Sequence, residues 1–65
     1  MSTLAERINK RMDELDMHQA DLARETGLTT ATIAYIVNDK SQDPRLSSVI
    51  AIARALGMTL DELVL

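Results

Sequence analysis

The sequence predicts a single all-α domain built from five short helices. Tyr35 is the one aromatic residue among the 65, and there is no Phe, Trp or Cys, so the core must be aliphatic, a composition that favours helices. Apolar residues recur at helical spacing, and no stretch shows the alternation of a half-buried strand. Helix-capping residues and helix-ending glycines divide the chain into five segments. At this length the chain has room for one domain, so we take 1–65 as a single unit.

The first helix is expected to begin after Thr3. Thr3 and Glu6 have the spacing of a capping box, in which each side chain accepts a hydrogen bond from the other residue's backbone N–H. The apolar residues that follow form one stripe at helical spacing: Leu4, Ile8, Met12 and Leu15. The stripe predicts an amphipathic helix with one face in the core.

A second helix is expected from about Gln19 to Thr26. Gly27 follows it, and glycine readily adopts the left-handed conformation that ends many helices. A third helix is expected from Thr29, a good N-cap residue, to about Asn38, without one charged side chain.

The third helix is expected to have two different faces. With about 100° of rotation per residue, Ile33, Ile36 and Val37 share one face, which should be buried. The opposite face should be exposed and comprises Thr30, Ala31, Ala34, Tyr35 and Asn38.

The remaining segments are a polar loop and two more helices. The loop spans residues 38–44, and the fourth helix is expected from about Leu46 to Leu56, closed by Gly57. Its inward residues are expected to be Leu46, Val49, Ile50, Ala53 and Leu56. A second capping box, Thr59 with Glu62, predicts a final turn or two that carries Leu60, Leu63 and Val64.

The composition argues against an enzyme, a metal site and a cofactor site. His18 is the only histidine and has no partner at the spacing of a metal site or a catalytic triad. The acidic cluster around Asp13 lies on the solvated side of the first helix. The longest apolar run, 33–37, is far below the ~20 residues that cross a bilayer. We therefore expect a soluble, cytoplasmic protein with no enzymatic activity.

Two short helices joined by a tight turn allow the second helix to stand out from the domain and enter a DNA major groove. The string QADLARETGLTTATI, residues 19–33, resembles the helix-turn-helix of the lambda repressor and Cro family in the spacing of its Gln, Leu-Ala, Gly and Ile. Residues 55–63, ALGMTLDEL, are similar to the ending of these domains. The resemblance covers roughly 4–63 and implies a compact five-helix lambda repressor-like DNA-binding domain, with its helix-turn-helix at about 19–38.

The resemblance also implies roles for individual residues. The expected contacts with DNA bases come from Thr30, Ala31, Ala34 and Tyr35. The expected contacts with DNA phosphates come from Gln19, Thr29, Asn38, Lys40, Arg11 and Arg45. Because the base-facing set lacks Arg, Lys, Gln and Glu, specificity would come from thymine-methyl contacts, the Tyr35 hydroxyl and DNA shape.

In the same family a buried Arg–Glu pair often joins the first and third helices. Met12 and Val37 stand at the equivalent positions here, and we predict that they pack directly against each other.

Two functions remain open from the sequence. The first is a sequence-specific transcriptional regulator of a phage or mobile element that binds an operator in double-stranded DNA. The second is a protein-interaction or antitoxin-like module, which the net charge of −3 favours. The two are distinguished by whether basic residues, among them Lys10, Arg24 and Lys40, flank the third helix. The apolar end, residues 63–65, indicates either a homodimer contact through the last helix or the point where a further domain follows.

Overall fold

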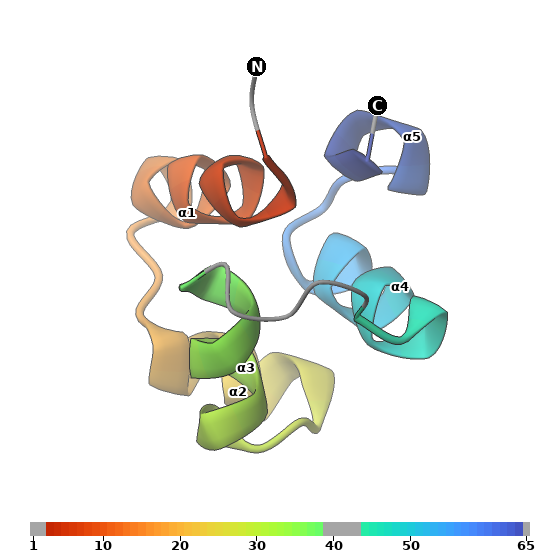
Figure 1. Cartoon of the computed structure of the whole chain (residues 1–65). Coiled ribbons are helices and arrows are strands. Elements are labelled where there is room, and N and C mark those ends of the chain that lie inside the picture. Colours follow the sequence, from red (N-terminus) through yellow and green to blue (C-terminus); the bar gives the residue numbers. More distant parts are fainter. Residues whose placement is uncertain (1–2, 39–43, 65) are drawn as a thin grey trace.

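The computed structural model describes residues 3–38 and 44–64, and these ranges contain five α-helices and no strand (Figure 1). The helices are α1 (Leu4–Leu15), α2 (Gln19–Thr26), α3 (Thr30–Val37), α4 (Leu46–Ala55) and α5 (Leu60–Val64). The predicted all-α class and the five segments are confirmed.

Capping boxes begin α1 and α5, as the spacing of their residues predicted. In the first, Thr3 Oγ1 accepts from the Glu6 N–H at 3.1 Å, and Glu6 Oε1 accepts from the Thr3 N–H at 3.2 Å. In the second, Thr59 and Glu62 exchange the same two bonds at 3.1 and 2.9 Å. Each box satisfies two backbone donors that a helix start leaves without an intrahelical partner.

Left-handed residues follow three of the helices. Gly27 (φ 76°) follows α2 and Gly57 (φ 67°) comes shortly after α4, as expected. Asp16 ends α1 with φ 55°, although it is not glycine. An Asp tolerates this conformation better than most residues, and the adjacent Met17 N–H bonds back to Met12 O at 2.8 Å.

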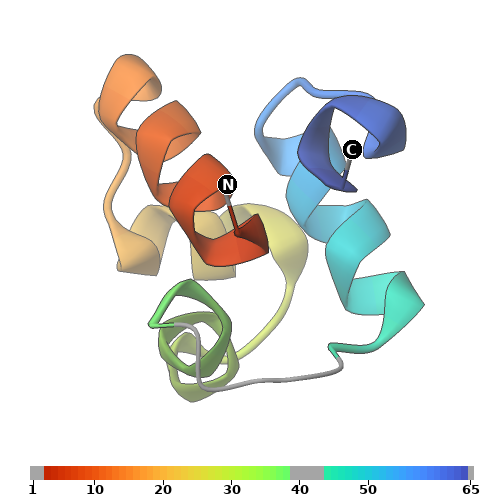
Figure 2. The ribbon, with the colours of Figure 1, turned by 45° about the horizontal axis from the view of Figure 1, so that its top comes forward.

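The helices pack around a single core. α1 packs against α3 and α5, α2 packs against α3 and α4, and α4 packs against α5. In Figure 1, α2 and α3 form one end of the molecule, and α1 and α5 lie at the other end. The turned view of Figure 2 again shows α1 beside α5. The largest fully buried side chains of the core come from all five helices or their ends: Ile8, Leu22, Ile33, Ile52, Leu56 and Leu63. Met12 and Val37 are both buried in this same cluster.

The predicted burial was wrong at two leucines. Leu15 is 41% exposed at the end of α1, and Leu46 is 64% exposed at the start of α4. Ile52, which was left out of the predicted core, is fully buried, whereas Ile50 is only half-buried. Aliphatic side chains occupy most of the surface of α4, and only the side with Ser47 and Arg54 is polar, so hydropathy alone does not select its inward face. Packing against α2 and α5 selects the face that contains Ile52.

None of the helices in the described ranges is long and apolar enough to span a membrane.

Candidate nucleic-acid interface

The turn between α2 and α3 is held by Thr26. Its Oγ1 donates to Leu22 O at 2.8 Å in the preceding helical turn and accepts from the Leu28 N–H at 3.2 Å. Gly27 supplies the left-handed backbone between them. The sequence analysis did not single out Thr26, although a threonine directly before a helix-ending glycine is well placed to bond both sides of the turn.

Thr29 is the N-cap of α3, as predicted. Its Oγ1 accepts from the Thr32 N–H at 3.1 Å and donates to Thr32 Oγ1 at 2.9 Å. The hydroxyl therefore fixes the start of α3. Its hydrogen can turn to a phosphate while the oxygen still accepts from the Thr32 N–H.

The two faces of α3 differ as the periodicity predicted. Ile33, Ile36 and Val37 are buried. On the opposite face Tyr35 is 55% exposed, and the other exposed residues are Thr30, Ala31 and Asn38. Ala34, expected on this face, is half-buried. The exposed face of α3 therefore carries no charged side chain. Its side chains are small except for that of Tyr35, which projects from it.

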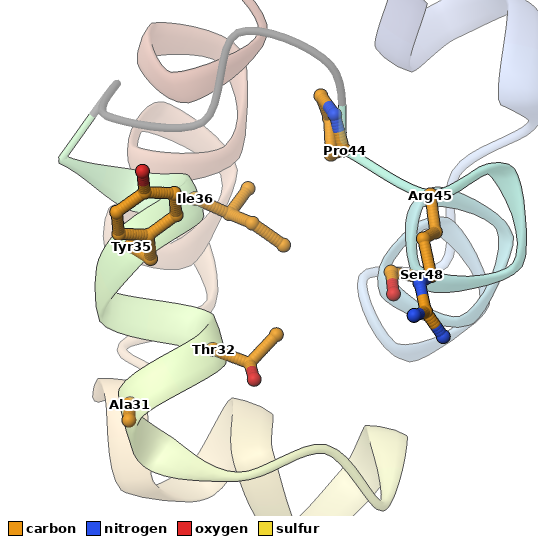
Figure 3. A pocket seen from close by; sticks show the side chains of 7 residues that line it. All are labelled: Ala31, Thr32, Tyr35, Ile36, Pro44, Arg45 and Ser48. Carbon is orange, nitrogen blue, oxygen red and sulfur yellow. The ribbon is translucent and has the colours of Figure 1, made fainter.

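A groove separates this face from the start of α4, and we call it the α3–α4 groove. It has a volume of about 370 Å³ and is lined by Ala31, Thr32, Tyr35, Ile36, Pro44, Arg45 and Ser48. Figure 3 shows Tyr35 and Arg45 on its opposite walls. Arg45 is the N-cap residue of α4 and is exposed, so its guanidinium adds a positive charge to the α4 wall of the groove.

The start of α2 carries Gln19, which is exposed. Just after it, the Asp21 carboxylate accepts from the His18 N–H at 3.0 Å and forms an ion pair with Arg24. Arg24 is therefore partly neutralised by a residue of its own helix. Gln19 remains at the helix start, where the resemblance places a phosphate contact.

The other basic residues are spread over the molecule. Lys10 and Arg11 of α1 line a hollow together with Met58 and Glu62, on the side of α5. Arg54 lines a different hollow, with residues of α2. Among the described residues, Arg45 is the only Lys or Arg that lines the α3–α4 groove. The basic side chains of the described ranges are therefore spread rather than gathered beside α3, and Lys40 lies outside the described residues.

Arg11 is bound at the end of α4. Its Nε donates to Leu56 O at 3.0 Å, and its Nη1 lies 3.5 Å from Glu14 Oε1. Glu14 lies on α1 with Arg11, whereas Leu56 is the C-cap residue of α4. The bond to Leu56 O therefore gives Arg11 a role in holding α1 to the C-terminal end of α4.

Within the described part of the chain, no three His, Cys, Asp or Glu side chains are grouped so that they could hold a metal ion.

A comparison with curated proteins found no match. Residues 7–64, almost the whole chain, match the Cro/C1-type HTH DNA-binding domain, a family of DNA-binding rather than enzymatic domains. The match agrees with the resemblance of residues 19–33 and 55–63, with the five helices and with the exposed third helix. The chain therefore belongs to the Cro/C1-type helix-turn-helix DNA-binding domain family.

Proposed function

We propose that the protein is a sequence-specific transcriptional regulator, of the phage-repressor or mobile-element type, that places α3 in the major groove of an operator. The observation that carries the proposal is the exposed face of α3, because its small side chains would let the helix approach base edges closely. Such a role implies a cytoplasmic protein without enzymatic activity of its own.

The exposed face of α3 would read bases mainly by apolar contact. Thr30, Ala31 and Ala34 present methyl groups or small side chains, which match the thymine methyl in the major groove. Tyr35 adds a ring and a hydroxyl that could bond a base edge. We infer that the operator is rich in A·T pairs at the contacted positions.

Phosphate contacts would flank this face. Gln19 at the start of α2, Thr29 and Asn38 at the two ends of α3, and Arg45 across the α3–α4 groove would fix the helix on the duplex. Lys40 completes the proposed set. Arg11 is the sixth expected phosphate contact, and because its Nε donates to Leu56 O we propose that it acts mainly in the fold.

The proposed homodimer would use the last helix. Leu63 is fully buried in the core, so it is not available to a partner. Val64 is 47% exposed and Leu60 is half-buried, so the dimer contact would rest mainly on these two side chains. A symmetric dimer would bind half-sites about one helical turn apart.

The test is selection of duplexes from a random pool by gel shift, with sedimentation to count subunits. We expect an enriched, A·T-rich and inverted-repeat sequence bound by two copies. Recovery of the random pool without enrichment, at physiological salt and limiting protein, would contradict a sequence-specific role.

A protein-interaction or antitoxin-like module is the second candidate. The net charge of −3 and the spread of basic residues favour it, because non-specific affinity for DNA comes mostly from phosphate contacts. Failure of the duplex selection, together with a partner protein that protects the α3–α4 groove from labelling, would establish this alternative.

A further inference from the structure

The C-terminal end of α3 differs from those of the neighbouring helices. A residue with positive φ follows α1 and α2, whereas Asn38, which follows α3, has φ −95°. The last turn of α3 contains no basic side chain that could interact with the terminal carbonyls. Yet the last carbonyls of a helix need donors from outside it. A donor from elsewhere in the fold can satisfy one of these carbonyls.

Asn9 of α1 supplies that donor. Its Nδ2 donates to Val37 O, the carbonyl of the last residue of α3, at 2.8 Å. The same nitrogen donates to Ala5 O, one turn back in α1, at 2.9 Å. Both bonds are partly shielded from solvent. Because two carbonyl oxygens face this position, only an amide nitrogen and not an oxygen can occupy it.

The bond to Ala5 fixes the rotamer of Asn9, so the side chain is held ready for Val37. The two bonded residues, Asn9 and Val37, are 28 positions apart in the sequence. Thr29 fixes the start of α3 through its own chain, whereas Asn9 ties the end of α3 to α1. The helix is thus held at both ends, with its buried residues between them.

We propose that Asn9 is a positioning residue for DNA reading, acting through Val37 to set where the C-terminal end of α3 lies. This inference rests on the proposed function, because it concerns the helix that would enter the groove. Tyr35 and Asn38, the proposed base and phosphate contacts nearest this end, would shift if the end were released. Positioning groups need support of this kind, since small displacements lose most of a directional contact.

The test compares Asn9→Asp and Asn9→Ala with the unaltered protein. Asp has the same shape but sets a carboxylate oxygen against two carbonyl oxygens. Ala removes the donor, and its better helix propensity offsets part of the loss in overall stability. Thr3→Ala is the matched control, because it weakens α1 through its cap and does not touch α3.

The first measurement is hydrogen exchange in the absence of DNA. We expect both Asn9 variants to speed exchange of the Asn38 amide, which bonds Ala34 O, by about three- to tenfold relative to amides of α2 and α4. This is the effect of one hydrogen bond on an equilibrium constant. Thr3→Ala should leave that ratio unchanged.

The second measurement is the ratio of affinities for the selected duplex and a random duplex at one salt concentration. We expect the Asn9 variants to lower this ratio about three- to tenfold, and the Thr3→Ala control to preserve it. Exchange at the end of α3 that matches the control, or an unchanged affinity ratio, would overturn the proposal. If the unaltered protein selects no duplex, the proposed function fails and the proposed role of Asn9 in DNA reading fails with it, while faster exchange would still show that Asn9 holds α3.

Discussion

Arg11 on α1 donates from Nε to the carbonyl oxygen of Leu56, the C-cap residue of α4, at 3.0 Å. The two residues are 45 positions apart in the sequence. A guanidinium at this point satisfies a terminal carbonyl and interacts favourably with the negative end of the helix dipole. The contact joins the first helix to the point where the chain leaves α4 for α5.

We predict that Arg11→Ala lowers the free energy of unfolding by about 1–2 kcal/mol, because a partly shielded charged hydrogen bond is lost. Urea denaturation measures this loss. Lys10→Ala, which removes the same charge from the adjacent position, should have a much smaller effect. The salt dependence of DNA binding should be the same for both variants. A flatter dependence for Arg11→Ala alone would show that Arg11 contacts a DNA phosphate.

Met12→Ala should destabilise the protein by ~2–4 kcal/mol, because Met12 is 5% exposed and truncation leaves a cavity in the core. Leu15→Ala on the same helix is the control, since Leu15 is 41% exposed and should lose ~1 kcal/mol or less. Denaturant melts of the two variants give the comparison. Equal losses would mean that Met12 is not packed as a core residue.

Tyr35→Ala should weaken binding to the selected operator by about 1–3 kcal/mol and leave affinity for random duplexes nearly unchanged, as expected for a base contact. Tyr35→Phe separates the ring from the hydroxyl. Competition binding at one salt concentration measures both variants. Equal losses of affinity for operator and random DNA would show that Tyr35 contacts a phosphate and not a base.

Arg45→Ala should weaken operator and random DNA alike and flatten the log–log salt dependence by ~0.9 per lost phosphate contact. The same result is expected for Lys40→Ala. Arg54→Ala removes an identical charge from the other end of α4, where Arg54 lines a different hollow, and should leave the slope unchanged. If the Arg45→Ala and Arg54→Ala variants have the same salt dependence of DNA binding, the α3–α4 groove is not a phosphate-binding surface.

The pKa of Glu62 lies below its ordinary value of 4.5, mainly because the Thr59 backbone N–H donates to its carboxylate, with further contributions from the Thr59 hydroxyl and the charge of Arg11. A lowered pKa in the folded state means that the carboxylate stabilises the protein above about pH 4.5. That contribution is lost as the pH falls through the folded-state pKa.

Glu62→Gln keeps an acceptor for the Thr59 N–H but removes this titration. Thermal melts between about pH 7 and pH 3 should therefore show a smaller loss of stability for the Gln variant than for the unaltered protein. If both proteins lose the same stability as the pH falls, the ionised Glu62 carboxylate does not stabilise the fold.

The helix boundaries and the two faces of α3 were predictable because their causes are local. The capping boxes at Thr3 and Thr59 join residues three apart, and Gly27 ends α2 through its own backbone freedom. In α3, the large aliphatic residues occupy one side, and small or polar residues with Tyr35 occupy the other, so periodicity separates the two faces. The family resemblance likewise depended on spacing within the helix-turn-helix and was confirmed by the match over residues 7–64.

The phase of α4, the burial of Leu63 and the partners of Arg11 and Asn9 were decided only by the tertiary structure. Ile50 and Ile52 are equally apolar, and only packing against α2 and α5 selects Ile52 for the core. The Asn9 and Arg11 bonds join residues 28 and 45 positions apart. A local pattern carries no information on such contacts, because they depend on where separate helices end relative to one another once the core has packed.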